Sequence, residues 1–222
     1  MLSNLAVQLD MPLLVFQLDL HEQSTNSHWM AVTNPHFEIP PLIDSAYIGA
    51  REFRAYSSIY REALNSNSPL YKFLCLYKIT EGIRKKRVAK AREAKKNGSS
   101  YTAPDEVIPK DPGDSVAWLN SLFAMAPAWK DYHLDAIFPS THRGRRFADL
   151  IGDDAPMTKL RNEIGHAFTA SSGKEVTNLD NKDFYVQAQG WLPLLKCVAR
   201  RMMRNEFPTE FLPKLTDYFP GR

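Results

Sequence analysis

The sequence has few cysteines, no long hydrophobic run and almost no net charge. Two cysteines among 222 residues, Cys75 and Cys197, cannot build a disulfide framework, and they fit a reducing, cytoplasmic compartment. No stretch reaches the roughly 20 consecutive apolar residues of a membrane-spanning helix, so we expect no membrane partner. Lys and Arg number 28 against 25 Asp and Glu, a net charge of +3. This balance excludes a strongly basic chromatin-type protein, but it allows a local basic patch.

The motifs of several large enzyme classes are missing too. The chain has no G-x-x-x-x-G-K-[ST], no G-x-G-x-x-G, no H-E-x-x-H and no G-x-S-x-G. An ATPase, a dinucleotide oxidoreductase, a zinc protease and an α/β-hydrolase therefore have no support. The spacing of His21, His28 and His36 suits no standard zinc pattern, and no cysteine lies near them. We expect no metal site and no cofactor.

Two parts of the chain differ in their pattern. Apolar and polar residues alternate between positions 14 and 21, which is the two-residue period of a β-strand. Residues 1–43 are therefore expected to form a small strand-containing extension. Helical spacing dominates residues 44–222, so we predict an all-α domain there. Within it, residues 97–113 are rich in Gly, Pro and Ser and are expected to form a loop.

Capping residues and prolines mark where the helices of this domain begin. A first helix is expected from Asp44 or Ser45 to about Asn65. Ser68 followed by Pro69 predicts the start of a long helix, because proline at the first helical position loses no hydrogen bond. Further helices are expected after Asp114, after Ser140 as far as Ile151, after Asp153 or Asp154, and over about 181–205 with Pro193 inside.

The residues after Pro156 divide cleanly between two faces of a helix that turns by about 100° per residue. One arc is apolar, with Met157, Leu160, Ile164, Ala167 and Phe168. The opposite arc holds Arg161, Asn162, Gly165, His166 and Thr169. Glycine inside a helix costs about 1 kcal/mol relative to alanine. Its bare surface at position 165 lets a phosphate or another backbone come close.

The groups of the polar arc suit phosphodiester cleavage in RNA. Histidine gives or accepts a proton near neutral pH, and arginine grips phosphate oxygens with a charged, bidentate fork. Together, His166 and Arg161 could let a ribose 2′-hydroxyl attack the adjacent phosphorus without a metal. One histidine supplies only one acid or base, so a two-fold dimer with two such faces would supply both. The alternative is an ordinary exposed helix face, where Arg and His are common.

The segment Arg161-Asn162-Glu163-Ile164-Gly165-His166 resembles the R-N-x-x-x-H motif of HEPN domains, small all-α domains that include many ribonucleases of toxin, antiviral and CRISPR systems. The order of elements over residues 44–205 is also similar: a long antiparallel helix pair, an insertion, the motif helix and a closing helix. The resemblance implies that Arg161 and His166 are catalytic and that Asn162 shapes the motif. It implies a dimeric helical bundle with both motifs at the interface, 2′,3′-cyclic phosphate products, and a setting in bacterial defence or with an antitoxin or regulatory protein.

Two other interpretations of the chain remain open. Some members of the HEPN family bind nucleotides or partners without cleaving RNA, which makes a non-catalytic binding or interaction module the main alternative. Residues 73–84, together with the motif, also resemble a group of bacterial methylamine-utilisation accessory proteins. That second resemblance implies an accessory role in amine metabolism.

Basic residues form two further candidate sites. The segment 84–96 has eight Lys or Arg residues and only Glu93 opposing them, a local charge of +7. Such a run either lines an RNA path, since phosphate contacts dominate nucleic-acid affinity, or is a solvated helix end. The segment 142–146 is either a second set of backbone contacts or a surface turn. The RNA-binding candidates are Arg84, Lys85, Arg87, Arg143, Arg145 and Arg146.

Glu81, Gly165 and Thr169 are the expected supporting residues of the motif. Glu81 interrupts an apolar stretch one turn before Arg84. It either holds Arg161 or Arg84 in place, or forms a partly buried salt bridge with no catalytic role.

Overall fold

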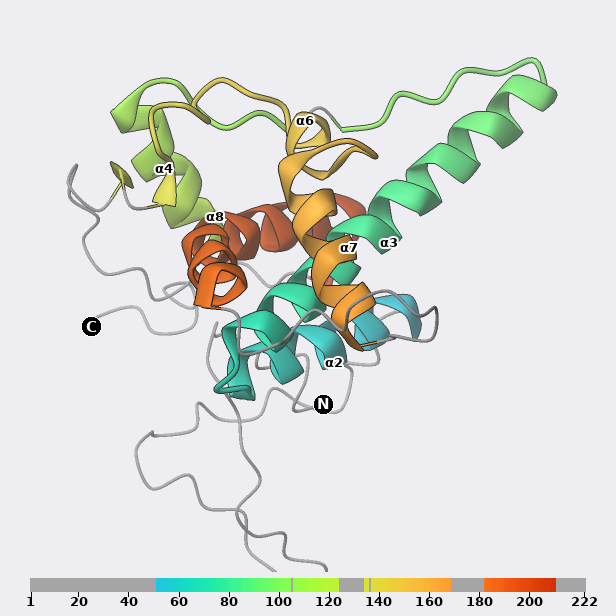
Figure 1. Cartoon of the computed structure of the whole chain (residues 1–222). Helices are drawn as coiled ribbons and strands as arrows, with labels where there is room; N and C mark the ends of the chain where they lie inside the picture. The colour runs from blue at the N-terminus through green and yellow to red at the C-terminus, as the bar shows by residue number, and fades with distance from the viewer. Residues whose placement is uncertain (1–50, 105, 124–133, 136, 169–181, 211–222) are drawn as a thin grey trace, which may run out of the picture.

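The computed structural model of the chain describes residues 51–104, 106–123, 134–135, 137–168 and 182–210 (Figure 1). The named elements are all helices: α2 (Arg51–Asn65), α3 (Pro69–Lys96), α4 (Pro112–Leu122), α6 (Ala148–Ile151), α7 (Pro156–Phe168) and α8 (Lys182–Glu206). The described residues contain no strand, and one isolated antiparallel bridge joins Val107 to Arg146. The all-α prediction is therefore confirmed for the residues that the structure describes. The predicted N-terminal extension, residues 1–43, lies outside the described residues.

Helices α2 and α3 form the predicted antiparallel pair. The Tyr71 hydroxyl donates to Glu62 near the connection, at 2.8 Å, and Lys86 pairs with Glu52 at the far end of α2. Ser68 caps α3 by accepting a hydrogen bond from the Tyr71 amide, and Pro69 follows at the first helical position, as predicted. The long α3 then runs to Lys96, and its last turns extend beyond the rest of the bundle (Figure 1).

The core forms where α8 packs along α3 (Figure 1). From α3, Phe73, Ile79 and Ile83 are fully buried, and from α8, Leu195 and Val198 are fully buried. The apolar faces of α2, α4, α6 and α7 close this core from several sides. Burial of these side chains at about 25 cal/mol per Å² is the main favourable contribution to the stability of the fold.

Gly82 lets α2 approach α3 closely. A Cβ atom at this position would lie 2.7 Å from the hydroxyl oxygen of Tyr56 and 3.1 Å from a ring carbon of the same side chain. The 2.7 Å distance is too short for a carbon atom, so any larger residue would displace the Tyr56 side chain.

Two helix starts differ from the sequence prediction. Asp111, and not Asp114, caps α4, because Pro112 takes the first helical position and the Asp111 carboxylate accepts from the amides of Gly113 and Asp114. The prediction of a helix from Ser140 to Ile151 is wrong for its first part, since only Ala148–Ile151 of this segment is helical. Gly144 has a φ of 74°, and its neighbours make strand-like hydrogen bonds to residues 106–108, which interrupts the helix there.

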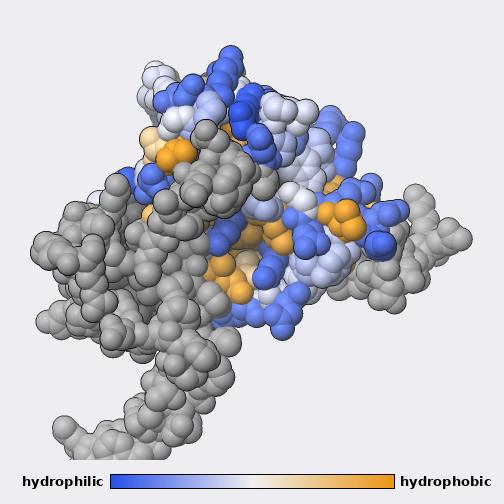
Figure 2. Space-filling model, turned by 90° about the vertical axis from the view of Figure 1, so that its left-hand side faces the viewer, coloured by the Kyte–Doolittle hydropathy of each residue, from blue (hydrophilic) through white to orange (hydrophobic). Residues whose placement is uncertain are grey.

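No helix in the described part of the chain is long and apolar enough to cross a membrane. On the described residues that Figure 2 colours, hydrophilic side chains are interspersed with small apolar patches. Among the described residues, the large apolar side chains that are exposed are few, and only the last two are neighbours in the sequence: Tyr71, Val88, Val107, Tyr185 and Val186.

Candidate functional site

Helix α7 has the two faces that its sequence predicts. Met157 and Ile164 are fully buried and Leu160 is 2% exposed, so the apolar face packs into the core. On the other side, Asn162 is exposed and the Arg161 side chain is 42% exposed. The helix thus presents a guanidinium and a carboxamide to solvent on a rigid support.

Two neighbours orient the Arg161 side chain. Its Nη1 donates a hydrogen bond to Oδ1 of Asn162, at 2.9 Å, and its Nη2 lies 3.7 Å from Oε2 of Glu81 on α3. The other carboxylate oxygen of Glu81 lies 3.0 Å from the ammonium of Lys85. Glu81 is therefore shared between Arg161 and Lys85. The sequence suggested Arg161 or Arg84 as its partner, and the structure shows a long ion pair with Arg161.

Gly165 leaves an open space on the polar face of α7. A Cβ atom there would lie within 4 Å of no atom in the described residues. Packing among the described residues therefore does not require a glycine at position 165. The bare helix surface there agrees with the sequence prediction. His166 follows in the same helix, but its side chain falls outside the described part of the structure, as does Thr169. Five residues of α-helix place the Arg161 and His166 Cα atoms about 7.5 Å apart along the axis.

Helix α3 also fixes the start of α7. The hydroxyls of Tyr77 and Thr158 are hydrogen-bonded at 2.7 Å, and Thr158 donates in turn to the carbonyl of Gly152 at 2.6 Å. Arg84 pairs with Asp153 at 2.7 Å, just before the helix. Arg84, a predicted RNA-binding residue, therefore ties α3 to the segment that leads into α7, and its side chain is 27% exposed.

Arg87, another predicted RNA-binding residue, lies in the interior. Its side chain is 8% exposed, and two guanidinium nitrogens bond the two carboxylate oxygens of Glu106 at 2.7 and 2.9 Å. Burial opposes the charge, but the hydrogen bonds and attraction of Glu106, with the added attraction of Glu206, outweigh it and raise the pKa of Arg87. This residue holds the fold together, and it cannot reach a phosphate at the surface.

The sequence pattern did not identify Glu206 as the main partner of the basic run. Its side chain is 4% exposed at the end of α8, and it pairs with Lys90 at 2.6 Å, Lys86 at 3.0 Å and Arg87 at 3.5 Å. Burial works against its charge, but hydrogen bonds from Lys90 and Lys86 dominate and lower the pKa of Glu206. Lys and Arg side chains that pack against the helical bundle need acidic partners. The sequence does not show which of its 25 Asp and Glu residues supply them.

The basic segment 142–146 is built against other parts of the chain. Arg143 donates to the Phe138 carbonyl at 3.1 Å and to Asp135 at 2.6 Å, and the Arg145 carbonyl accepts from the Ile108 amide at 3.0 Å. Arg146 is exposed. His142 stacks on Trp191 at 4.9 Å, and burial together with the nearby Arg145 lowers its pKa. These contacts involve the loops and α8, whereas Arg161 contacts Glu81 and Asn162.

Within the described residues, no group of three His, Cys, Asp or Glu side chains is arranged to hold a metal ion. A family model described as "Methylamine utilization protein MauJ" matches residues 56–204, which is more than half of the chain. The matched range includes α7 and most of α2 and α8. No significant match was found among curated proteins or among solved structures.

Proposed function

We propose that this chain, which belongs to the family of the methylamine utilization protein MauJ, is a metal-independent endoribonuclease with its site on the exposed face of α7. The observation that carries the proposal is the half-exposed Arg161, positioned by Asn162 and Glu81 beside the open surface at Gly165. A guanidinium binds phosphate oxygens in a bidentate fork, and Gly165 itself adds no side chain to this face. The HEPN-like motif adds His166 on the same helix.

The proposed reaction is an attack by the ribose 2′-oxygen on the adjacent phosphorus. The 2′-hydroxyl proton passes to one imidazole, the new P–O bond forms, and the bond to the 5′-oxygen breaks. That oxygen takes a proton from the second histidine, which acts as an imidazolium, and this leaves a 5′-hydroxyl and a 2′,3′-cyclic phosphate. Arg161 stabilises the charge that builds on the phosphorane oxygens.

Two imidazoles require two copies of the α7 face. We therefore propose a homodimer in which α7 of one protomer faces α7 of its partner, as in a HEPN-like bundle. Light scattering tests this arrangement at the concentration of the assay. A monomer that still cleaves RNA would overturn the paired-site reaction.

The activity test compares wild type with His166→Ala on a mixed RNA pool. The matched control is Glu163→Gln, which changes an exposed residue of the same helix outside the proposed chemistry. We expect cleavage by wild type and the control, and its loss by His166→Ala with fold and oligomeric state unchanged. Equal residual cleavage by all three proteins would mean a contaminating nuclease and would refute the proposal.

A non-catalytic role in methylamine utilization is the second candidate function. The family description favours it, and so does Arg161, which in the free chain is already engaged by Asn162 and Glu81. In this reading the α7 face holds a nucleotide, RNA or a protein partner without turnover. The defence setting, an antitoxin partner and a cytoplasmic location belong to the ribonuclease proposal and rest on the HEPN resemblance.

A further inference from the structure

The basic residues of α3 separate into two faces with different surroundings. An α-helix turns by about 100° per residue. One face of α3 therefore lies about 100° to 200° around the helix axis from Lys85, and it carries Lys86, Arg87 and Lys90. These three pair with Glu52, Glu106 and Glu206 and hold the bundle together. Their charges are therefore neutralised by the fold itself.

The other face of α3 carries a row of cations, which we define as Lys85, Arg92 and Lys96. The three residues lie within about 40° of one another around the helix axis, and Glu81 lies about 40° from Lys85. All three are exposed, and the Lys85 side chain remains 67% exposed although its ammonium lies 3.0 Å from the Glu81 carboxylate. The row begins beside Glu81, which contacts Arg161, and runs about 22 Å from Glu81 to the end of α3.

The end of α3 leaves this row accessible. From residue 88 to residue 100 every residue is exposed except Ala94, which is partly exposed. Figure 1 shows these turns extending past the bundle, with the chain returning toward α6 along a separate path. The interaction of cations with the helix dipole is confined to the last turn, so it accounts for Lys95 and Lys96 and not for Lys85 or Arg92.

We propose that the cation row of α3 is a track for single-stranded RNA that leads to Arg161. This inference rests on the proposed function, because it names the path by which the substrate of the α7 site is held. A single row of cations matches one phosphate backbone, and Arg161 continues the row across Glu81 onto α7. The track supplies affinity that does not depend on base sequence.

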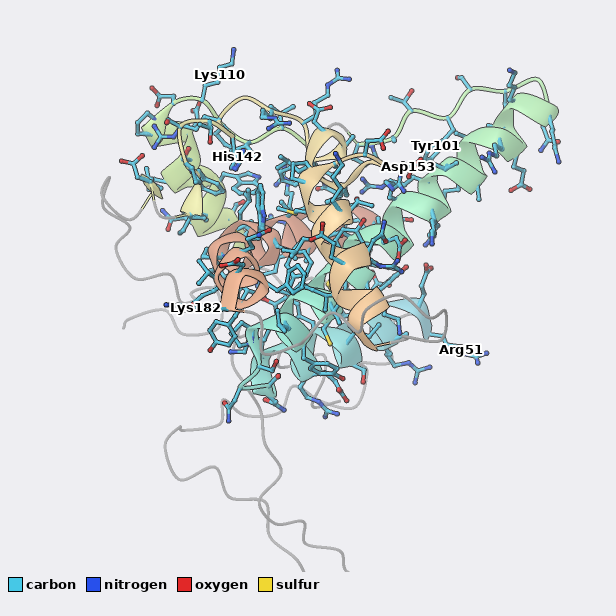
Figure 3. All side chains as sticks on the ribbon, in the orientation of Figure 1. Arg51, Tyr101, Lys110, His142, Asp153 and Lys182 are labelled. Atoms are coloured by element: carbon cyan, nitrogen blue, oxygen red, sulfur yellow. The ribbon has the colours of Figure 1, made fainter. Side chains whose placement is uncertain are left out.

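The test measures binding of a fluorescent 2′-O-methyl RNA single strand by anisotropy over a series of salt concentrations. This probe lacks the 2′-hydroxyl, so it reports binding whether or not the chain is a ribonuclease. The variant is Arg92→Gln/Lys96→Gln. The matched control is Lys110→Gln/Lys182→Gln, which removes two exposed cations away from the free end of α3 (Figure 3).

Two lost phosphate contacts reduce the slope of log K against log salt by about 1.4 for a single strand, which corresponds to about 25-fold weaker binding at 0.1 M salt. We expect this change for Arg92→Gln/Lys96→Gln and less than threefold weakening for the control. Equal weakening by both pairs, or no binding by wild type, would overturn the track. Wild type that binds the probe but does not cleave ordinary RNA would refute the ribonuclease proposal alone.

Discussion

The substitution Arg87→Met tests whether the interior of the basic run stabilises the fold. Met keeps much of the volume of the Arg stem, but it leaves the buried Glu106 carboxylate without its bidentate partner. Asn205 still donates to Glu106 at 2.9 Å, and Glu206 keeps Lys86 and Lys90. Removing one member of a buried ion pair costs about 3 to 5 kcal/mol, and the remaining partners place this case near 3 kcal/mol.

Urea unfolding followed by circular dichroism measures this loss. For a chain of this length, about 3 kcal/mol corresponds to a Tm lower by about 6 to 12 °C. The control is Arg92→Met on the exposed face of the same helix, which we expect to change the free energy of unfolding by less than about 0.5 kcal/mol. Adding Glu106→Gln to Arg87→Met should recover part of the loss, because it removes the unpaired charge. A loss below about 1 kcal/mol for Arg87→Met would mean that the buried ion pair with Glu106 contributes little to stability.

Further predictions follow from the glycines and the acids. Gly82→Ala should destabilise the fold by about 1 to 3 kcal/mol, because its methyl group meets Tyr56, and chemical unfolding measures the loss. Gly165→Ala should stabilise α7 by up to about 1 kcal/mol and yet weaken the proposed RNA cleavage, since the methyl group would occupy the space proposed for a phosphate; unchanged cleavage would argue against a site there. The lowered pKa of Glu206 means that its stabilising contribution is present at neutral pH and is lost as the pH falls through that lowered value. An acid titration of stability should therefore be flatter for Glu206→Gln than for wild type.

Local signals in the sequence predicted much of the helical architecture. Ser68 and Pro69 identify the start of α3 because the cap and the proline act within one turn. The division of α7 into a buried and an exposed face follows from helical periodicity alone, and it placed Arg161 and Asn162 correctly on the exposed side.

Predictions that depended on distant partners were less successful. Arg87 looked like its basic neighbours because the sequence does not show that Glu106 and Glu206 meet it in the interior. The segment after Ser140 has the composition of a helix start, but pairing with residues 106–108 and the left-handed backbone of Gly144 outweigh the local preference. The sequence alone does not show which face of α3 packs against α8, so it does not show which of the basic residues of α3 stay exposed.

The chemistry of the RNA ends distinguishes attack by the 2′-hydroxyl from other cleavage reactions. Wild type and His166→Ala are incubated with RNA in EDTA, and the termini of the products are mapped. If the ribonuclease proposal is right, 2′,3′-cyclic phosphate and 5′-hydroxyl ends form in the wild-type reaction only. Cleavage that leaves 3′-hydroxyl ends, or that persists unchanged in His166→Ala, would contradict it.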